Sequence, residues 1–94
     1  MSSLIVTYDL VGTDAKSDNY DKLIKHIKNK KIYENWARIQ LSTWIIVTSK
    51  KPETVRDELE SYTHPKDRLF VARLTGVAAW HNAKCKNEWL TENL

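Results

Sequence analysis

The order of six segments, each with the pattern of a strand or of a helix, constrains the fold of this chain more than any other feature of its sequence. Four of them are rich in β-branched and aromatic residues, as strands are: Leu4–Leu10, Asn35–Leu41, Thr43–Ser49 and Arg68–Thr75. The other two carry apolar residues at the spacing of one helix face: Tyr20, Leu23, Ile24 and Ile27 in one, Val55, Leu59 and Tyr62 in the other. The predicted order is therefore strand, helix, strand, strand, helix, strand.

This order predicts an α+β fold of the ferredoxin-like βαββαβ type, a sandwich in which two helices cover one face of a four-stranded antiparallel sheet. The chain has 94 residues, enough for one hydrophobic core, so we expect a single ferredoxin-like domain over residues 1–94. Val77–Trp80 is expected to add a short strand or a turn, and Lys84–Asn93 a short C-terminal helix. We expect this tail, or a second copy of the chain, to cover the other face of the sheet.

Residues typical of loops and helix starts give the expected boundaries. Val11–Ser17 reads as a loop, and Asp18 is a candidate N-cap with Asp21 three residues later. Pro52 suits the first position of the second helix. Little more than Ser42 separates the second and third strands, which favours a tight hairpin, although no Asn-Gly or Asp-Gly pair marks the turn. A single bent strand is the competing interpretation.

The positive charge of the chain is concentrated in one segment. The formal net charge is +3, and residues 22–31 contain no acidic residue and these lysines: Lys22, Lys25, Lys28, Lys30 and Lys31. The rest of the chain carries a slight acidic excess. On the predicted helix, Lys22 and Lys25 point away from the apolar stripe and Lys28 flanks it. Such a patch attracts phosphate backbones or anionic surfaces, although lysines also fill exposed helix positions without binding a partner.

Other features narrow the class of protein. The apolar stretches are too short to span a bilayer and the N-terminus lacks the basic start of a signal peptide, so we expect a cytoplasmic chain with no membrane partner. Cys85 is the only cysteine, which forbids an internal disulfide and suits a reducing compartment. Gly12 and Gly76 are too far apart for a glycine-rich phosphate loop. His81 and Cys85 are four residues apart, but two ligands are too few for a structural zinc site.

The tryptophans, of which the chain has four, allow two interpretations. As stacking platforms they bind unpaired bases. As core and interface residues they bury apolar area, which is their more frequent use.

Asp9 is the residue whose position most indicates a chemical role. It closes a predicted strand after Leu4, Ile5, Val6 and Tyr8, and an acid at the end of a buried strand needs hydrogen bonds or a cation. Either Asp9 accepts backbone N–H bonds from the following loop, or it binds a hard cation such as Mg²⁺. One carboxylate per chain is too little for such a site, but a symmetric dimer brings two together.

Three motifs resemble the small CRISPR-associated Cas-two family. They are Tyr8-Asp9-Leu10 before the basic helix, the run Ala37–Trp44 with its Arg-Ile-Gln-x-Ser segment, and Asp67–Val71. The run Asp67–Trp80 resembles a branch of small SinR-like proteins, and VapD-type toxin ribonucleases share the same scaffold. The resemblance spans most of residues 3–80. The loop after Asp9 departs from the family because it lacks the arginines that usually follow the family's Asp.

The resemblance implies a ferredoxin-like homodimer that holds a Mg²⁺ ion between the two copies of Asp9. Family members are described as metal-dependent nucleases, or as a DNA-binding scaffold beside an integrase. A VapD-like role implies an antitoxin partner instead.

The resulting hypothesis is a homodimer that acts on DNA or RNA as a Mg²⁺-dependent endonuclease, with Asp9 as the catalytic metal ligand. In this hypothesis Arg38 steadies the phosphate and Ser42 and Thr43 add hydroxyl contacts. Affinity for the nucleic-acid backbone comes from Lys22, Lys25 and Lys28. The alternative is a non-catalytic dimer that binds nucleic acid or another protein, and a small-ligand sensor is a third class.

Overall fold

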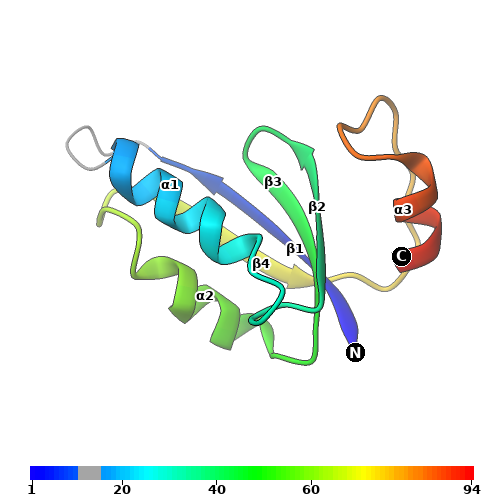
Figure 1. Ribbon diagram of the computed structural model, residues 1–94, viewed down its shortest axis with the longest axis horizontal. Coiled ribbons are helices and arrows are strands. Elements are labelled where there is room, and N and C mark those ends of the chain that lie inside the picture. The colour runs from blue at the N-terminus through cyan, green and yellow to red at the C-terminus, as the bar shows by residue number, and fades with distance from the viewer. Residues whose placement is uncertain (11–15) are drawn as a thin grey trace.

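The predicted order of strands and helices is confirmed. The computed structural model describes residues 1–10 and 16–94. Its elements are β1 (Ser2–Asp9), α1 (Lys16–Ile27), β2 (Asn35–Gln40), β3 (Thr43–Thr48), α2 (Pro52–Glu60), β4 (Arg68–Arg73) and α3 (Asn87–Asn93). The strands form an antiparallel four-stranded sheet in the order β2-β3-β1-β4, which is the ferredoxin-like topology. Helices α1 and α2 lie on one side of this sheet and α3 lies on the other (Figure 1).

The alternation of side chains along β1 determines which face of the sheet is buried by the two longer helices. Leu4, Val6 and Tyr8 are buried in the main core, with these residues of α1, α2, β3 and the loop before β2: Leu23, Ile27, Val55, Leu59, Trp44, Ile46 and Tyr33. Successive side chains of a strand point to opposite faces. Thr7 and Asp9 therefore lie on the face that α1 and α2 do not cover.

The second and third strands form a hairpin, so the interpretation as one bent strand is wrong. Strands β2 and β3 pair antiparallel through a two-residue turn at Leu41 and Ser42. The register shifts between Arg38 and Gln40, where β2 has an irregularity. The backbone oxygen of Ser42 accepts a hydrogen bond from the backbone N–H of Tyr8 at 3.1 Å. The hairpin turn is therefore tied to β1, beside the end of that strand.

The start of α1 differs from the prediction. The helix begins at Lys16, so Asp18 lies in its first turn and is not the N-cap. An acidic residue is favourable at both places, because both lie near the positive end of the helix dipole. The expected loop Val11–Ser17 falls largely on residues 11–15, which lie outside the described residues. Pro52 is the first residue of α2, as predicted.

The C-terminal tail lies on the second face of the sheet, which was one of the two predictions for that face. The predicted helix Lys84–Asn93 begins at Asn87, because the backbone N–H of Lys84 donates to the backbone oxygen of Ile39 at 3.0 Å and holds this segment against the edge of β2. Leu90 of α3 is buried, and the hydroxyl of Ser3 donates to the backbone oxygen of Asn93 at 2.5 Å. The segment Val77–Trp80 forms no strand.

The length of a helix decides whether it can cross a membrane. The longest helix of the described residues is α1, with 12 residues. Among those residues, no helix combines the length and the apolar character needed to cross a bilayer.

Candidate functional site

Asp9 lies at an exposed end of the sheet and is paired with a cation. It is opposite Arg68 in the register of β1 and β4, and Arg68 Nη1 donates to Asp9 Oδ2 at 2.9 Å. Both side chains are largely exposed, at 63% and 72%, so this ion pair adds little to stability. A small cavity of about 190 Å³ adjoins the pair and is lined in part by Thr7 and Phe70. Phe70 is itself 52% exposed on this face.

The residues around Asp9 do not form a metal site within one chain. In the part of the chain that the structure describes, no group of three or more His, Cys, Asp or Glu side chains lies together. Mg²⁺ prefers several oxygen ligands, whereas Asp9 has the guanidinium of Arg68 beside it. In the hypothesis of a shared ion, the second carboxylate comes from another copy of the chain.

Arg38 lies on the opposite face of the sheet from Asp9. It pairs in register with Trp44, whose side chain is in the main core on the side of α1 and α2. Its Nε and Nη2 donate to the backbone oxygen of Leu41 at 3.1 and 2.7 Å, and Nη2 also donates to the hydroxyl of Tyr20 at 3.1 Å. Asp9 and Arg38 therefore do not form one phosphate site in a single chain.

The two hydroxyl residues of the hairpin are engaged with their neighbours. Thr43 is 6% exposed, and its hydroxyl lies 3.0 Å from that of Thr7 and accepts from the side-chain amide of Gln40 at 3.1 Å. Ser42 is half-buried beside it. These contacts hold the hairpin against β1. The side chain of Thr43 lies on the same face of the sheet as that of Asp9.

The three candidate lysines of α1 do not share one environment. Lys22 and Lys25 are exposed on the outward side of the helix, as predicted from their spacing. Lys28 follows the last turn, and its Nζ lies 5.5 Å from the ring centroid of Trp36. Among the described residues, Lys28 is therefore the one of the three that contacts an aromatic ring of β2.

A second group of basic residues lies near Lys28, where the tail meets the edge of β2. A cavity of about 350 Å³ opens there between β2 and the tail. Its walls are formed by Trp36, Ala37, Arg38, Lys84, Cys85, Lys86 and Trp89. We call this cavity the basic cleft, and Lys28 contacts one of its lining residues, Trp36. Its lining contains cations and aromatic rings and no carboxylate.

The aromatic walls of the basic cleft are held in place by contacts outside it. Trp36 packs against the fully buried Trp44, with ring centroids 5.8 Å apart. The side-chain oxygen of Asn35 accepts from the backbone N–H of Trp36 at 2.9 Å and from the indole N–H of Trp89 at 3.3 Å. The indole N–H of Trp36 is buried and has no hydrogen-bond partner among the described residues. Trp44 thus fills the core, which is one of the two predicted uses. Trp36 and Trp89 line a cavity, and stacking on bases stays a prediction for them.

Cys85 and His81 do not form a ligand pair on a helix. Both precede α3, and the ring of His81 is within hydrogen-bond distance of the side-chain amide of Asn82, at 3.1 Å. Burial raises the pKa of the Cys85 thiol, which therefore stays protonated at neutral pH. Cys85 contributes to the cleft as a small half-buried side chain.

The sequence analysis missed a polar network centred on Glu58 of α2. Tyr33 donates to Glu58 Oε1 at 2.8 Å, Lys50 donates to Oε2 at 2.6 Å, and His26 lies 3.3 Å from Oε1. The other ring nitrogen of His26 is 3.1 Å from the hydroxyl of Tyr62. Partial burial acts to raise the pKa of Glu58, but the hydrogen bonds from Lys50, Tyr33 and His26 outweigh it and lower that pKa. No local pattern signals this network, because its members come from α1, α2 and three separate loops.

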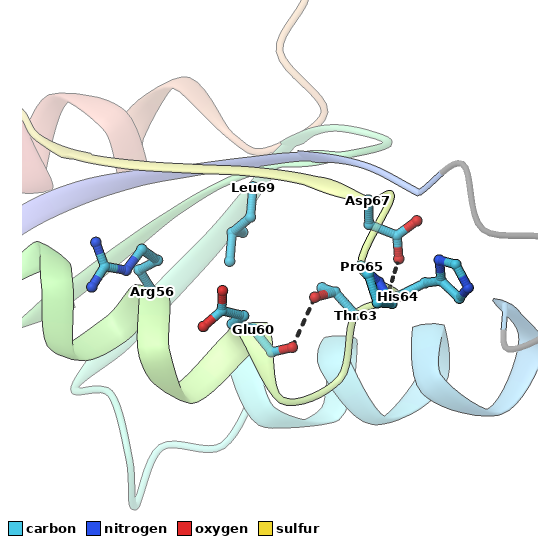
Figure 2. Close-up of a pocket in the computed structure, with 7 residues that line it drawn as sticks. All are labelled: Arg56, Glu60, Thr63, His64, Pro65, Asp67 and Leu69. Carbon is cyan, nitrogen blue, oxygen red and sulfur yellow. Dashed lines mark hydrogen bonds between the residues drawn. The ribbon is translucent and has the colours of Figure 1, made fainter.

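A larger groove lies between α2 and β4 (Figure 2). It has a volume of about 530 Å³ and is lined by Arg56, Glu60, Thr63, His64, Pro65, Asp67 and Leu69. Its polar groups largely serve the loop itself: Thr63 donates to the backbone oxygen of Glu60, and Asp67 accepts from the backbone N–H of His64. Charges of both signs line it, so the groove indicates no particular ligand.

Comparisons with known proteins add no family to these observations. No family model matches the chain, and no curated protein matches it. The resemblance to the Cas-two, SinR-like and VapD-type proteins therefore stays a prediction.

Proposed function

We propose that this chain binds nucleic acid through the basic cleft. The observation that carries this proposal is that three cations, Arg38, Lys84 and Lys86, line a cavity whose lining contains no acid. A fourth cation, Lys28, contacts the ring of Trp36, another residue of that lining. Among the described residues, none of the four forms an ion pair with a carboxylate. Unpaired cations on one surface attract a polyanion by releasing its counterions.

The location of these cations supports the proposal beyond the charge of the chain. Lys84 and Lys86 are 56 and 58 positions after Lys28 in the sequence. The fold nevertheless brings these two lysines to a cavity lined by Trp36 of β2, the residue whose ring Lys28 contacts. Arg38 also lines the cavity, and its Cζ lies 4.7 Å from the ring centroid of Trp44 in the neighbouring core. A phosphate backbone that passes this cavity would meet the tail lysines and Lys28 together.

Reversing two cleft charges tests this function. We expect Lys84→Glu with Lys86→Glu to weaken binding of labelled DNA and RNA more than tenfold, and to reduce the slope of log K against log salt by about 1.4–1.8, at roughly 0.7–0.9 per lost contact. Lys51→Glu with Lys66→Glu is the matched control, because it changes the net charge equally at exposed positions outside the cleft lining. Fluorescence anisotropy at several salt concentrations measures both. Equal loss in the two double variants would mean that net charge, and not the cleft, determines binding.

The second candidate function is a Mg²⁺-dependent endonuclease that acts as a homodimer. The observation that favours it is the position of Asp9 beside the half-exposed Phe70, on a sheet face that α1 and α2 leave open. A second copy seated there would bury Phe70 and could bring two Asp9 carboxylates together. Light scattering tests whether the chain dimerises, and we expect a molecular mass of about twice 11.0 kDa. A monomer at micromolar concentration would remove this candidate and leave the cleft unaffected.

Replacing Asp9 by Asn tests the same candidate chemically. If two copies of Asp9 hold Mg²⁺, the wild type gains stability in millimolar Mg²⁺ and Asp9→Asn does not, since a ligand that binds only the folded state stabilises it. The Asn variant should also lose any Mg²⁺-dependent cleavage while it keeps its fold. Asp57→Asn is the control, because Asp57 forms an exposed ion pair with Arg56 elsewhere on the surface. Cleavage that persists in purified Asp9→Asn protein would exclude Asp9 as the metal ligand.

A further inference from the structure

We infer that the basic cleft takes one unpaired base of a single-stranded nucleic acid, stacked against the ring of Trp89. This inference rests on the proposed function, because it states which form of nucleic acid the cleft selects. It concerns the apolar walls of the cleft, whereas the proposed function depends on its cations.

The lining of the cleft defines the chemistry of its occupant. The lining combines the apolar or aromatic residues Trp36, Ala37 and Trp89 with the basic residues Arg38, Lys84 and Lys86. Its volume of about 350 Å³ is within the usual range for small-ligand sites. An occupant that satisfies both parts has a flat apolar surface attached to negative charge. A nucleotide combines these properties, because each base has a π-face and is joined to a phosphate.

The walls are preorganised for such an occupant. One oxygen of Asn35 binds the backbone of Trp36 and the indole of Trp89, so it links β2 to α3 across the cleft. The contact with Trp44 holds the other side of Trp36.

The cleft is expected to select single strands over duplexes. A base inside a duplex is paired and stacked, and it must be extruded at a cost of a few kcal/mol before it can enter a protein pocket. A base of a single strand is already accessible, and an aromatic wall stacks on it without regard to sequence. The basic residues of the lining attract both forms through their phosphates, so only the apolar walls distinguish them.

The test compares three probes that carry the same label: a short single strand, an abasic strand of the same length, and a duplex of the same sequence. Binding is measured by anisotropy at one salt concentration. We expect the wild type to prefer the normal strand to the abasic strand by roughly tenfold to a hundredfold, the usual scale for one stacked base. Trp89→Ala should lose this preference, and Trp89→Phe, which keeps an aromatic face, should retain most of it.

Trp80→Ala is the matched control, because Trp80 lies in the same tail, is 39% exposed and is absent from the cleft lining. This variant should keep the full preference for the normal strand. Equal wild-type affinity for the normal and abasic strands would overturn the base site and leave the proposed function standing, provided that Lys84→Glu with Lys86→Glu still abolishes binding. A preference that survives in folded Trp89→Ala protein would also overturn it. If the wild type binds none of the three probes, the inference and the proposed function fail together.

Discussion

The Trp44→Ala variant is expected to lose about 3–5 kcal/mol of unfolding free energy, the usual cost of deleting a large buried aromatic side chain. Trp44 is fully buried near the start of β3, where it contacts Trp36 and donates its indole N–H to the hydroxyl of Tyr8 at 3.0 Å. A domain of this size has about 5–14 kcal/mol of stability in total. The substitution therefore removes a large share of it, which urea denaturation followed by circular dichroism measures.

Two companion variants separate the causes of this loss. Trp80→Ala removes the same side chain from a half-exposed position and should cost less than about 1 kcal/mol. Trp44→Phe keeps most of the buried volume but leaves the hydroxyl of Tyr8 without the indole donor. Burial raises the pKa of that hydroxyl to about 12, so it stays neutral and the loss should be about 1–3 kcal/mol. A Trp44→Ala variant as stable as Trp80→Ala would contradict the packing of the core.

Replacing Glu58 by Gln is expected to cost about 2 kcal/mol at neutral pH, because the carboxylate accepts hydrogen bonds from Lys50 and Tyr33 in a partly buried network. Gln keeps the length of the side chain but cannot compensate the charge of Lys50. For a domain of this size the change corresponds to a fall in Tm of roughly 10 °C. Calorimetry at several pH values measures both the size of the effect and its dependence on pH.

The pH dependence of this effect has a definite sign. The pKa of Glu58 is lower in the folded protein than in the unfolded chain, so its contribution to stability is complete above the unfolded pKa, near 4.5. That contribution is lost as the pH falls through the lower, folded pKa. The difference between wild type and Glu58→Gln should therefore be constant near neutral pH and shrink under acid conditions. Glu60→Gln, at an exposed position of the same helix, should show no such difference.

The fold could be predicted from the sequence because its signals are local. The alternation of Leu4, Val6 and Tyr8 and the helical spacing of Leu23 and Ile27 each depend on a few neighbouring residues, and both patterns matched the structure. The start of the last helix was misplaced for the opposite reason. Whether Lys84 is helical depends on a hydrogen bond to a strand far earlier in the chain, and no local pattern carries that information.

The candidate site was less predictable than the fold. The sequence indicated Asp9, the α1 lysines and Arg38 from their residue types, but it could not show that Asp9 and Arg38 point to opposite faces of the sheet. The basic cleft depends on Trp36 and Trp89, which are 53 positions apart and meet because the tail crosses the sheet. The Glu58 network likewise joins residues up to 36 positions apart.

The sheet order has a consequence for how copies of the chain could assemble along their strand edges. In the order β2-β3-β1-β4, the outer edges are those of β2 and β4. The edge of β2 is obstructed, because its register is irregular and Lys84 of the tail already occupies the backbone oxygen of Ile39. Within the described residues, the edge of β4 has no such cover, although Arg68 and Arg73 place a charge at each of its ends.

A sheet with two open edges can add strands without limit and form fibres, whereas a sheet with one open edge can join only a single equivalent copy. The course of the tail therefore makes edge-to-edge growth self-terminating at two chains.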